Sequence, residues 1–316
     1  MKFQTKIPLE KQIHNQIDYN SKLFLLGSCF AENIGEKLEY FKFQSRVNPF
    51  GILFHPKAIE TCVTNAINKK TFYKEDVFMR NEQWHCFEAH SKLSHPDKEI
   101  LIKELNYNVE QTRQQLKSAT HIIITLGTSW VYRFIEGDKI VANCHKVPQK
   151  GFLKELLTVD EVVSNLEAII ALVKLENPQV SIIFTVSPIR HIRDGFVENN
   201  LSKSHLISGV HQVVDPRQNV SYFPSYEIVM DELRDYRFYT EDMLHPNQIA
   251  INYIWECFKT VWMSQDAVAT MEKVEEIQKG LNHKAFNPSS EQHKKFMASL
   301  RQKQEELNQR FSHIVF

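Results

Sequence analysis

Short apolar runs alternate with segments of helical periodicity along the first two thirds of the chain. The apolar runs cover residues 22–26, 121–127 and 180–186. The periodic segments cover residues 32–41, 97–118 and 159–176, and each places its apolar residues on one helical stripe. The runs are rich in Leu, Ile and Val, a composition typical of strands that are buried on both faces. The pattern therefore predicts strands that alternate with helices.

This alternation predicts an α/β fold, a three-layer α/β/α sandwich with a mainly parallel sheet. Parallel neighbours need crossover connections, and the predicted helices supply them. In an open sheet of this kind, the loops at the carboxyl ends of the strands gather at one edge. We therefore expect Ser28, Thr128-Ser129 and Ser187, which follow the three runs, to lie close together.

The remaining segments complete one domain over residues 1–263. Residues 48–95 hold several prolines and predict a small insertion, with a helix near 56–69 and an antiparallel pair built from 71–73 and 84–87. A strand is expected at 131–134. Helices at 226–233 and 247–262 are expected to close the core.

Residues 264–316 have a different composition and predict a helical extension. Residues 290–312 are rich in Lys, Glu and Gln, with sparse apolar positions. One interpretation is a solvated helix that packs a thin apolar stripe on the domain. The other is a helix that binds a partner or forms a homo-oligomer.

Composition excludes several classes of function. Lys+Arg and Asp+Glu are each 38, so the net charge is zero and gives no electrostatic case for nucleic acid. No window approaches the roughly 20 apolar residues of a membrane span. The first residues do not resemble a secretory signal, so we expect a cytoplasmic protein. Five widely spaced cysteines argue against a disulfide framework and a structural zinc site, and we expect no metal or cofactor.

Ser28 is the strongest candidate for a nucleophile. It follows a buried strand and precedes a helix, where it would be presented at the rim of the sheet beside the backbone N–H groups of the helix start. Asp242 and His245 form an Asp-x-x-His pair before another helix. This spacing lets the carboxylate hold the imidazole Nδ1–H and leaves Nε2 free to accept a serine proton.

Each of these residues also has a structural interpretation. Ser28 could simply cap the following helix, as serine often does at such a boundary. Asp242 could be a surface residue, with His245 a cap beside a proline. Cys29 is an alternative nucleophile, although a buried thiol is the commoner outcome for such a residue.

The motifs of the chain resemble the GSCFA family, whose name is the sequence of residues 27–31. The further matching motifs are Asn48-Pro49-Phe50-Gly51, Leu126-Gly127-Thr128-Ser129-Trp130, Asn143-Cys144-His145-Lys146, Ser187-Pro188-Ile189-Arg190-His191 and Asp242-Met243-Leu244-His245-Pro246. The family looks like a branch of the SGNH (GDSL-like) hydrolases. The resemblance implies a flavodoxin-like fold, serine ester hydrolysis or acyl transfer, and no metal or organic cofactor.

The resemblance also implies an oxyanion hole. In the wider superfamily a glycine N–H and an asparagine side chain assist the serine, the latter in a Gly-x-Asn-Asp block. Residues 127–130 occupy that block without an asparagine. Ser129 could donate instead, or Asn143 or Asn48 could reach in from a neighbouring loop. The amides of Ser28 and Gly51 are the candidate backbone donors.

Two further motifs could line the substrate site. His145 belongs to a polar cluster that suits a substrate-binding rim, although a structural turn explains it equally well. Arg190 and Arg193 could bind a carboxylate or phosphate, or could form an ion pair within the chain, for instance with Asp194.

The sequence thus supports two hypotheses. The first is a serine esterase or O-acyltransferase that acts on a small-molecule or carbohydrate ester. The second is a catalytically degenerate relative that binds an acylated or carbohydrate ligand without turnover. The missing asparagine keeps the second hypothesis open.

Overall fold

The computed structural model of the chain describes residues 5–284 and 286–316. Its main sheet contains five strands: β1 (Lys22–Gly27), β2 (Gln44–Val47), β5 (His121–Leu126), β9 (Ser181–Val186) and β10 (Val220–Tyr222). The strands lie in the order β10-β9-β5-β1-β2, and all neighbours are parallel. Numbered along the chain, this is the order 2-1-3-4-5 of flavodoxin-like folds.

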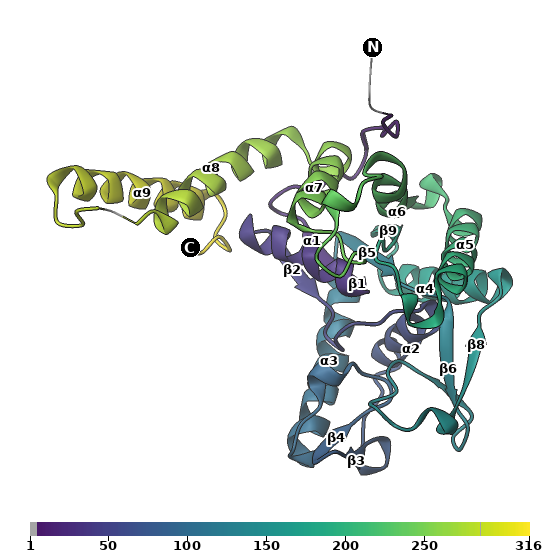
Figure 1. Cartoon of the computed structure of the whole chain (residues 1–316). Helices are drawn as coiled ribbons and strands as arrows, with labels where there is room; N and C mark the ends of the chain where they lie inside the picture. Colours follow the sequence, from purple (N-terminus) through teal and green to yellow (C-terminus); the bar gives the residue numbers. More distant parts are fainter. Residues whose placement is uncertain (1–4, 285) are drawn as a thin grey trace.

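The alternation of side chains along β1 creates the two cores of the sandwich. Phe24 and Leu26 belong to one hydrophobic cluster, and Leu23 and Leu25 belong to the other. The first cluster includes helices α2 (Pro56–Ile67), α3 (Lys98–Ser118), α4 (Val159–Glu176) and α5 (Phe196–Val213). The second includes α1 (Cys29–Tyr40), α6 (Ser225–Glu227) with the π-helical turn Ile228–Glu232, and α7 (Gln248–Trp262). Helices therefore cover both faces of the sheet (Figure 1), which confirms the predicted three-layer α/β/α fold.

The segment between β2 and α3 differs in part from the prediction. Residues 71–73 are not a strand, because the backbone N–H and C=O of Phe72 are paired with the Asn106 side chain rather than with a neighbouring strand. The antiparallel pair is instead β3 (Phe78–Arg80) with β4 (Gln83–His85). The expected helix near 56–69 is present as α2, and it packs in the helical layer beside α4.

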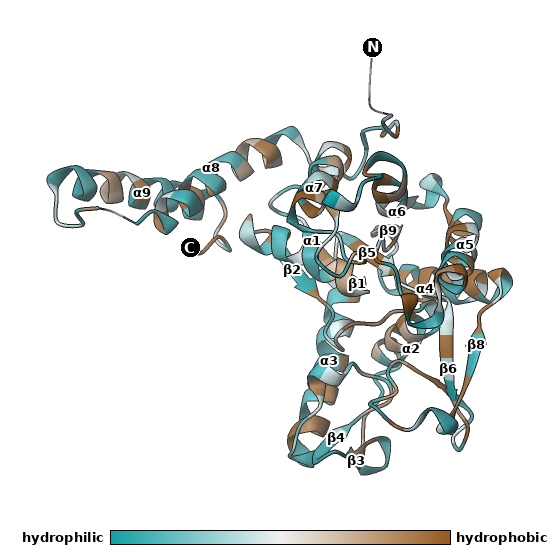
Figure 2. Ribbon diagram, in the orientation of Figure 1, coloured by the Kyte–Doolittle hydropathy of each residue, from teal (hydrophilic) through white to brown (hydrophobic). Residues whose placement is uncertain are grey.

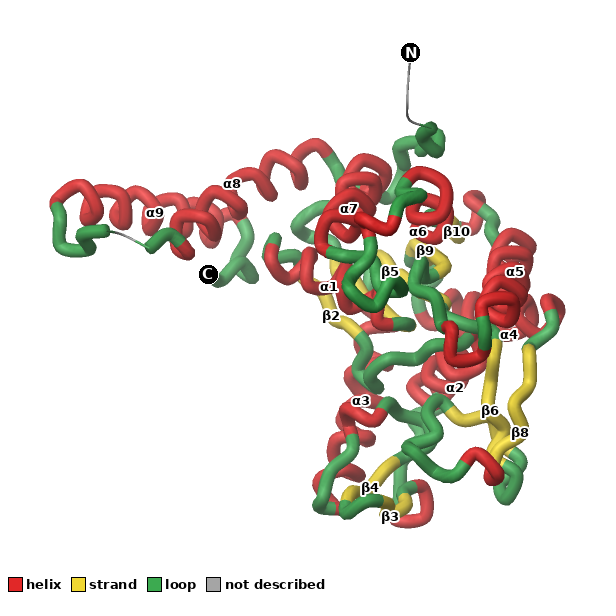
Figure 3. Tube along the Cα trace, viewed as in Figure 1, coloured by secondary structure: helices red, strands yellow, loops and turns green. Residues whose placement is uncertain are grey.

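A second sheet was not expected from the sequence. Strand β6 (Trp130–Phe134) pairs antiparallel with both β7 (Lys139–Val141) and β8 (Phe152–Leu156). Figure 3 shows β6 and β8 as a separate pair of yellow strands beside the main body. This sheet follows directly on the loop after β5, so it stands next to the carboxyl edge of the parallel sheet.

The C-terminal part consists of α8 (Gln265–Asn282) and α9 (Glu291–Arg310), which project away from the sheet (Figure 1). Teal, hydrophilic residues predominate along α9 (Figure 2). The chain then returns toward the body, where Phe311 packs on Tyr19 with ring centroids 5.2 Å apart. Leu307 and Phe311 share the buried cluster of α1 and α7. Within the described ranges, no helix has the length and apolar character to cross a membrane.

Candidate active site

The turn between β1 and α1 has a backbone that only glycine fits well. Gly27 has φ +129°, and a Cβ there would lie 2.0 Å from the carbonyl oxygen of Thr125. The close approach lets the N–H of Ser28 donate to that same oxygen at 3.0 Å. The turn therefore binds β1 to β5 and fixes Ser28 between the two strands.

Ser28 occupies the position of the helix cap but does not act as one. Its φ and ψ are −70° and 172°, as expected for the residue before a helix, yet its side chain makes no capping hydrogen bond. The residue is fully buried, and its Oγ has no partner among the described residues. A buried hydroxyl without a partner is costly and unusual in a folded protein. Capping therefore does not explain the presence of this serine.

Ser28 lies at the point where the strand order reverses, which is where open α/β sheets bind ligands. Strands β1 and β5 flank this point, and Gly127 follows β5. A Cβ at Gly127 would lie 3.2 Å from Cβ of Ser28. Gly127 is thus held against the serine, and its small size keeps room beside it.

Lys203 of α5 joins two of the loops at this edge. Its Nζ donates to the carbonyl oxygens of Gly127 at 2.6 Å and of Ser187 at 2.7 Å. These bonds bring the loops after β5 and β9 together, as the sequence predicts for this edge. Burial lowers the pKa of the Lys203 ammonium from its ordinary value of 10.5 to about 7.

Replacement of Lys203 by methionine should change the pH dependence of stability. The pKa of Lys203 is lower in the folded state than in the unfolded chain, so the folded state binds fewer protons between pH 7 and 10.5. Wild type should therefore gain stability relative to Lys203→Met as pH rises through this window, by up to about 1.4 kcal/mol per pH unit. Urea unfolding at pH 7.5 and 9 measures this difference. A stability difference between wild type and Lys203→Met that stays constant over this pH range would refute the pKa assignment.

Asp242 and His245 form the predicted pair. Nδ1 of His245 donates to Oδ2 of Asp242 at 2.5 Å, and Oδ1 of Asp242 accepts from Thr240 Oγ1 and from the N–H groups of Leu244 and His245. Led by the His245 amide, these donors hold the pKa of the Asp242 carboxyl well below its usual range. The carboxylate stays ionised and orients the ring, so Nε2 of His245 is left to accept a proton.

Arg190 stabilises the loop that carries this pair. Its guanidinium donates to the Tyr239 hydroxyl at 2.5 Å and to Sδ of Met230 at 2.9 Å. Tyr239 in turn forms a β-bridge with Pro246, next to His245. Arg190 is therefore engaged within the chain, although its partner is a tyrosine rather than Asp194.

The structure does not join Ser28 and His245 directly. No hydrogen bond connects them within the described ranges, and the His245 side chain is 49% exposed whereas Ser28 is buried. A third residue, His191, packs against Gly127, which is also in contact with Ser28. A Cβ at Gly127 would lie 3.3 Å from Nε2 of His191, beside Ser28. The pKa of His191 is lowered to about 3, first by burial, then by the charges of Lys203 and His245.

His191 was not assigned a role from the sequence. Its ring packs edge-on against Phe54, with centroids 5.5 Å apart, and its backbone N–H donates to Asn199 Oδ1. Its Nε2 is buried and has no partner among the described residues. The one sequence feature that could have indicated a role for His191 is its position in the motif that follows β9.

Asn48 contacts the turn that carries Ser28 and has an unused donor. Its φ of 44° is left-handed, which asparagine tolerates. Its Oδ1 accepts from the N–H of Gly27 at 2.9 Å, while Nδ2 is buried without a partner in the described part of the chain. One end of the amide is thus fixed to the Gly27–Ser28 turn, and the other end is free to donate.

Three other candidate oxyanion donors are already engaged, namely the N–H groups of Gly51 and Ser28 and the hydroxyl of Ser129. The N–H of Gly51 donates to the Asn48 carbonyl at 2.8 Å, and that of Ser28 donates to Thr125. Oγ of Ser129 donates to the Ser202 carbonyl at 3.1 Å and is buried there. The hydroxyl of Ser129 is therefore occupied, whereas Nδ2 of Asn48 has no partner among the described residues.

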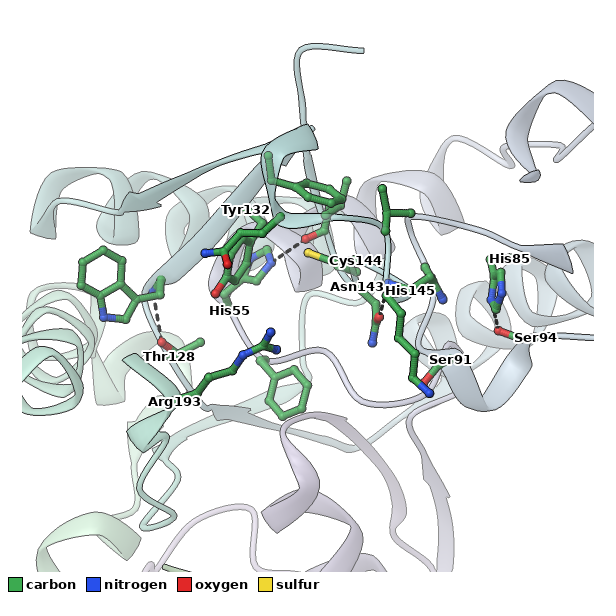
Figure 4. A pocket seen from close by; sticks show the side chains of 18 of the residues that line it. His55, His85, Ser91, Ser94, Thr128, Tyr132, Asn143, Cys144, His145 and Arg193 are labelled. Carbon is green, nitrogen blue, oxygen red and sulfur yellow. Dashed lines mark hydrogen bonds between the residues drawn. The ribbon is translucent and has the colours of Figure 1, made fainter. Parts of the chain in front are cut away.

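Asn143 and His145 lie together in a neighbouring pocket (Figure 4). Oδ1 of Asn143 accepts from the N–H of His145. Nε2 of His145 pairs with the Cys86 carbonyl at 2.7 Å, and burial lowers the pKa of this histidine to about 4. These contacts stabilise the turn after β7, and the two residues also form part of the pocket wall.

Cys29 is a poor nucleophile in this environment. Burial, followed by the charge of Glu32, raises the pKa of its thiol. Because the thiolate is the reactive form, a raised pKa disfavours the thiol mechanism.

Comparison with known families identifies the chain. Residues 22–258 match the GSCFA family, and residues 274–316 match a family described as GSCFA domain protein, C-terminal domain. The chain therefore belongs to the GSCFA family. No curated protein matches it.

Solved structures with some likeness to the chain include three esterases. A carbohydrate esterase family 3 protein from Talaromyces cellulolyticus is 10% identical, covers 81% of this chain and 99% of its own, and has a TM-score of 0.36. An acetyl esterase mutant with acetate ion is 11% identical, with the same coverage and TM-score. An acetyl xylan esterase from the rumen bacterium Butyrivibrio proteoclasticus is 12% identical, with coverages of 84% and 65% and a TM-score of 0.35. Likenesses at this level do not assign an activity to the chain.

Proposed function

We propose that the protein is a serine hydrolase that cleaves an ester or transfers its acyl group to another alcohol. The observation that carries the proposal is the cluster of unpaired polar atoms at the switch point. Ser28 Oγ, Asn48 Nδ2 and His191 Nε2 are all buried, and none has a partner among the described residues. Such atoms are tolerated where a substrate supplies the missing contacts.

In the proposed reaction, Oγ of Ser28 forms a bond to the acyl carbon as its proton passes to Nε2 of His245. The C–O bond to the leaving alcohol then breaks, and His245 returns the proton to that alcohol. Water or an acceptor alcohol attacks the acyl-enzyme in the second half, with its proton passing through His245 back to Ser28. Asp242 keeps the imidazole oriented throughout.

Asn48 and His191 are the proposed donors to the oxyanion. The Asn48 amide is fixed at Gly27, the residue that precedes the serine. His191, with a pKa of about 3, remains neutral in the working pH range, and a neutral imidazole can donate one hydrogen bond. Its low basicity also makes it a weak general base, which leaves that role to His245.

One observation favours the second candidate function, a binding protein without turnover. Ser28 is 0% exposed, and it makes no hydrogen bond to His245 within the described residues. The proposed reaction therefore requires neighbouring side chains to move so that the carbonyl reaches Oγ. A chain that cannot make this movement would bind an acylated or carbohydrate ligand at the same edge without cleaving it.

A fluorophosphonate probe distinguishes the two functions. The hydrolase should become covalently labelled, and peptide mass spectrometry should place the adduct on Ser28. Hydrolysis of short-chain aryl esters and acetylated sugars should accompany the labelling. Absence of both labelling and hydrolysis, at protein concentrations that would reveal an active enzyme, would support the binding protein.

A further inference from the structure

A large pocket opens beside the candidate active site. Its volume is about 790 Å³, within the range of sites for small organic ligands. Phe54, Thr128 and His191 line it, and these residues also surround Gly127 and Ser28. The far walls come from the small sheet, through Trp130 and Tyr132, and from the β3–β4 hairpin.

The charges in this pocket are unbalanced. Arg193 and Lys146 line it, and neither forms an ion pair with any described residue. The acid Asp194 also lines it, but its carboxylate is paired with Lys154 at 2.6 Å. Burial lowers the pKa values of the pocket imidazoles His55 and His145 to about 4, so both are neutral at pH 7. Two cations therefore face the pocket without an opposing anion.

Arg193 is placed to bind a ligand in this pocket. Figure 4 shows its guanidinium pointing into the cavity, on the side where Tyr132 and His55 lie. Figure 4 draws no hydrogen bond from the guanidinium to the other pocket residues shown, so its five donors remain available to a ligand. A planar fork of this kind matches a carboxylate or a phosphate with two parallel hydrogen bonds.

The remaining wall suits a polar ring. Trp130 and Tyr132 supply aromatic surface, and Gln83, Asn143 and Gln149 supply amide donors and acceptors. Aromatic faces with a few placed polar groups are typical of sites that bind compact polar ligands. One face of Trp130 is covered by Lys154, whose Nζ lies 4.2 Å from the ring centroid.

We propose that this pocket binds the alcohol part of the ester, and that this part is a sugar-like ring with an anionic group held by Arg193. The proposal rests on the proposed function, because it places the scissile ester at Ser28. Lys146 adds long-range attraction for the anion, while the sugar-like ring lies against Trp130 and Tyr132.

The test compares three acetylated methyl glycosides: glucose, glucuronate with a carboxylate at C6, and glucose 6-phosphate. Wild type should have a kcat/KM at least about tenfold higher for an anionic ester than for the neutral one, as expected for one charged hydrogen-bonded contact. Arg193→Gln should lower this preference at least about tenfold, mainly through KM. The carboxylate and phosphate esters show which anion is preferred.

Arg301→Gln is the matched control, because it removes the same charge from the exposed surface of α9. It should retain the anionic preference. Equal kcat/KM for charged and neutral esters in wild type, or an unchanged preference in Arg193→Gln, would overturn the proposal while leaving the esterase intact.

A binding measurement keeps the two proposals separate. Calorimetry on wild type with methyl glucuronoside, methyl glucoside and glucose 6-phosphate requires no turnover. Anion binding that Arg193→Gln weakens would support the pocket even if no ester were cleaved. Failure of every anion to bind, together with intact Ser28 labelling, would reject the pocket alone.

Discussion

Alanine in place of Ser28 is expected to abolish fluorophosphonate labelling and to lower kcat for ester hydrolysis by about 10⁴-fold or more. The substitution removes the only protein atom that forms a bond to the acyl carbon in the proposed reaction. The remaining donors can still polarise a bound carbonyl, which leaves a small residual rate over water. Steady-state hydrolysis of an aryl acetate and intact-protein mass spectrometry after labelling measure the two effects.

Ser28→Ala should change the chemistry without disturbing the fold. Ser28 Oγ has no partner in the described part of the chain, so its removal breaks no hydrogen bond and should not destabilise the fold. Cys29→Ser is the matched control one residue away and should retain labelling and most activity. Labelling that persists in Ser28→Ala but disappears in Cys29→Ser would instead assign the chemistry to the thiol.

The parallel sheet could be predicted because its strands are recognisable as apolar runs in the sequence. Each of the central strands is apolar over most of its length, and the alternate side chains of β1 fill different cores, as Phe24 and Leu25 show. Helices α3 and α4 have regular stripes on one face. In these elements the local pattern and the tertiary environment agree, so the sequence alone is sufficient.

Helix α5 could not be predicted in the same way, because the first half of its buried face is polar. Asn199, Ser202 and Lys203 are buried on it and hydrogen-bond to the loops after β5 and β9. This arrangement weakens the amphipathic pattern on which sequence reasoning depends. The same feature is important for function, since α5 positions the loops that contain Gly127 and His191.

The residues of the candidate site also differ in how well the sequence predicts them. Ser28 and the pair Asp242 and His245 lie in short motifs whose geometry is local, so spacing alone suggested their chemistry. The proposed oxyanion donors depend on contacts between residues far apart in the sequence. Asn48 is selected because Gly27 holds its Oδ1, and His191 because α5 and Phe54 fix its backbone and ring. Sequence reasoning named Asn48 only as one of several candidates and gave His191 no role.

Phenylalanine in place of His191 is expected to lower kcat by about 10²–10³-fold with little change in KM. The substitution keeps an aromatic ring against Phe54 but removes the donor that lies beside Ser28. Because the oxyanion develops only in the transition state, loss of its donor affects kcat rather than substrate binding. Steady-state kinetics on a neutral aryl acetate and on an acetylated sugar measure both constants.

His191→Asn separates the donor role from a structural one, because asparagine restores an N–H donor in a smaller side chain. This variant should recover at least about tenfold of the kcat lost in His191→Phe, since a single oxyanion donor is worth that much or more. His245→Ala should lose activity whichever residue stands at position 191, because His245 is the proposed base. If His245→Ala instead retains full activity, His191 is the base and the assignment of the two histidines must be exchanged.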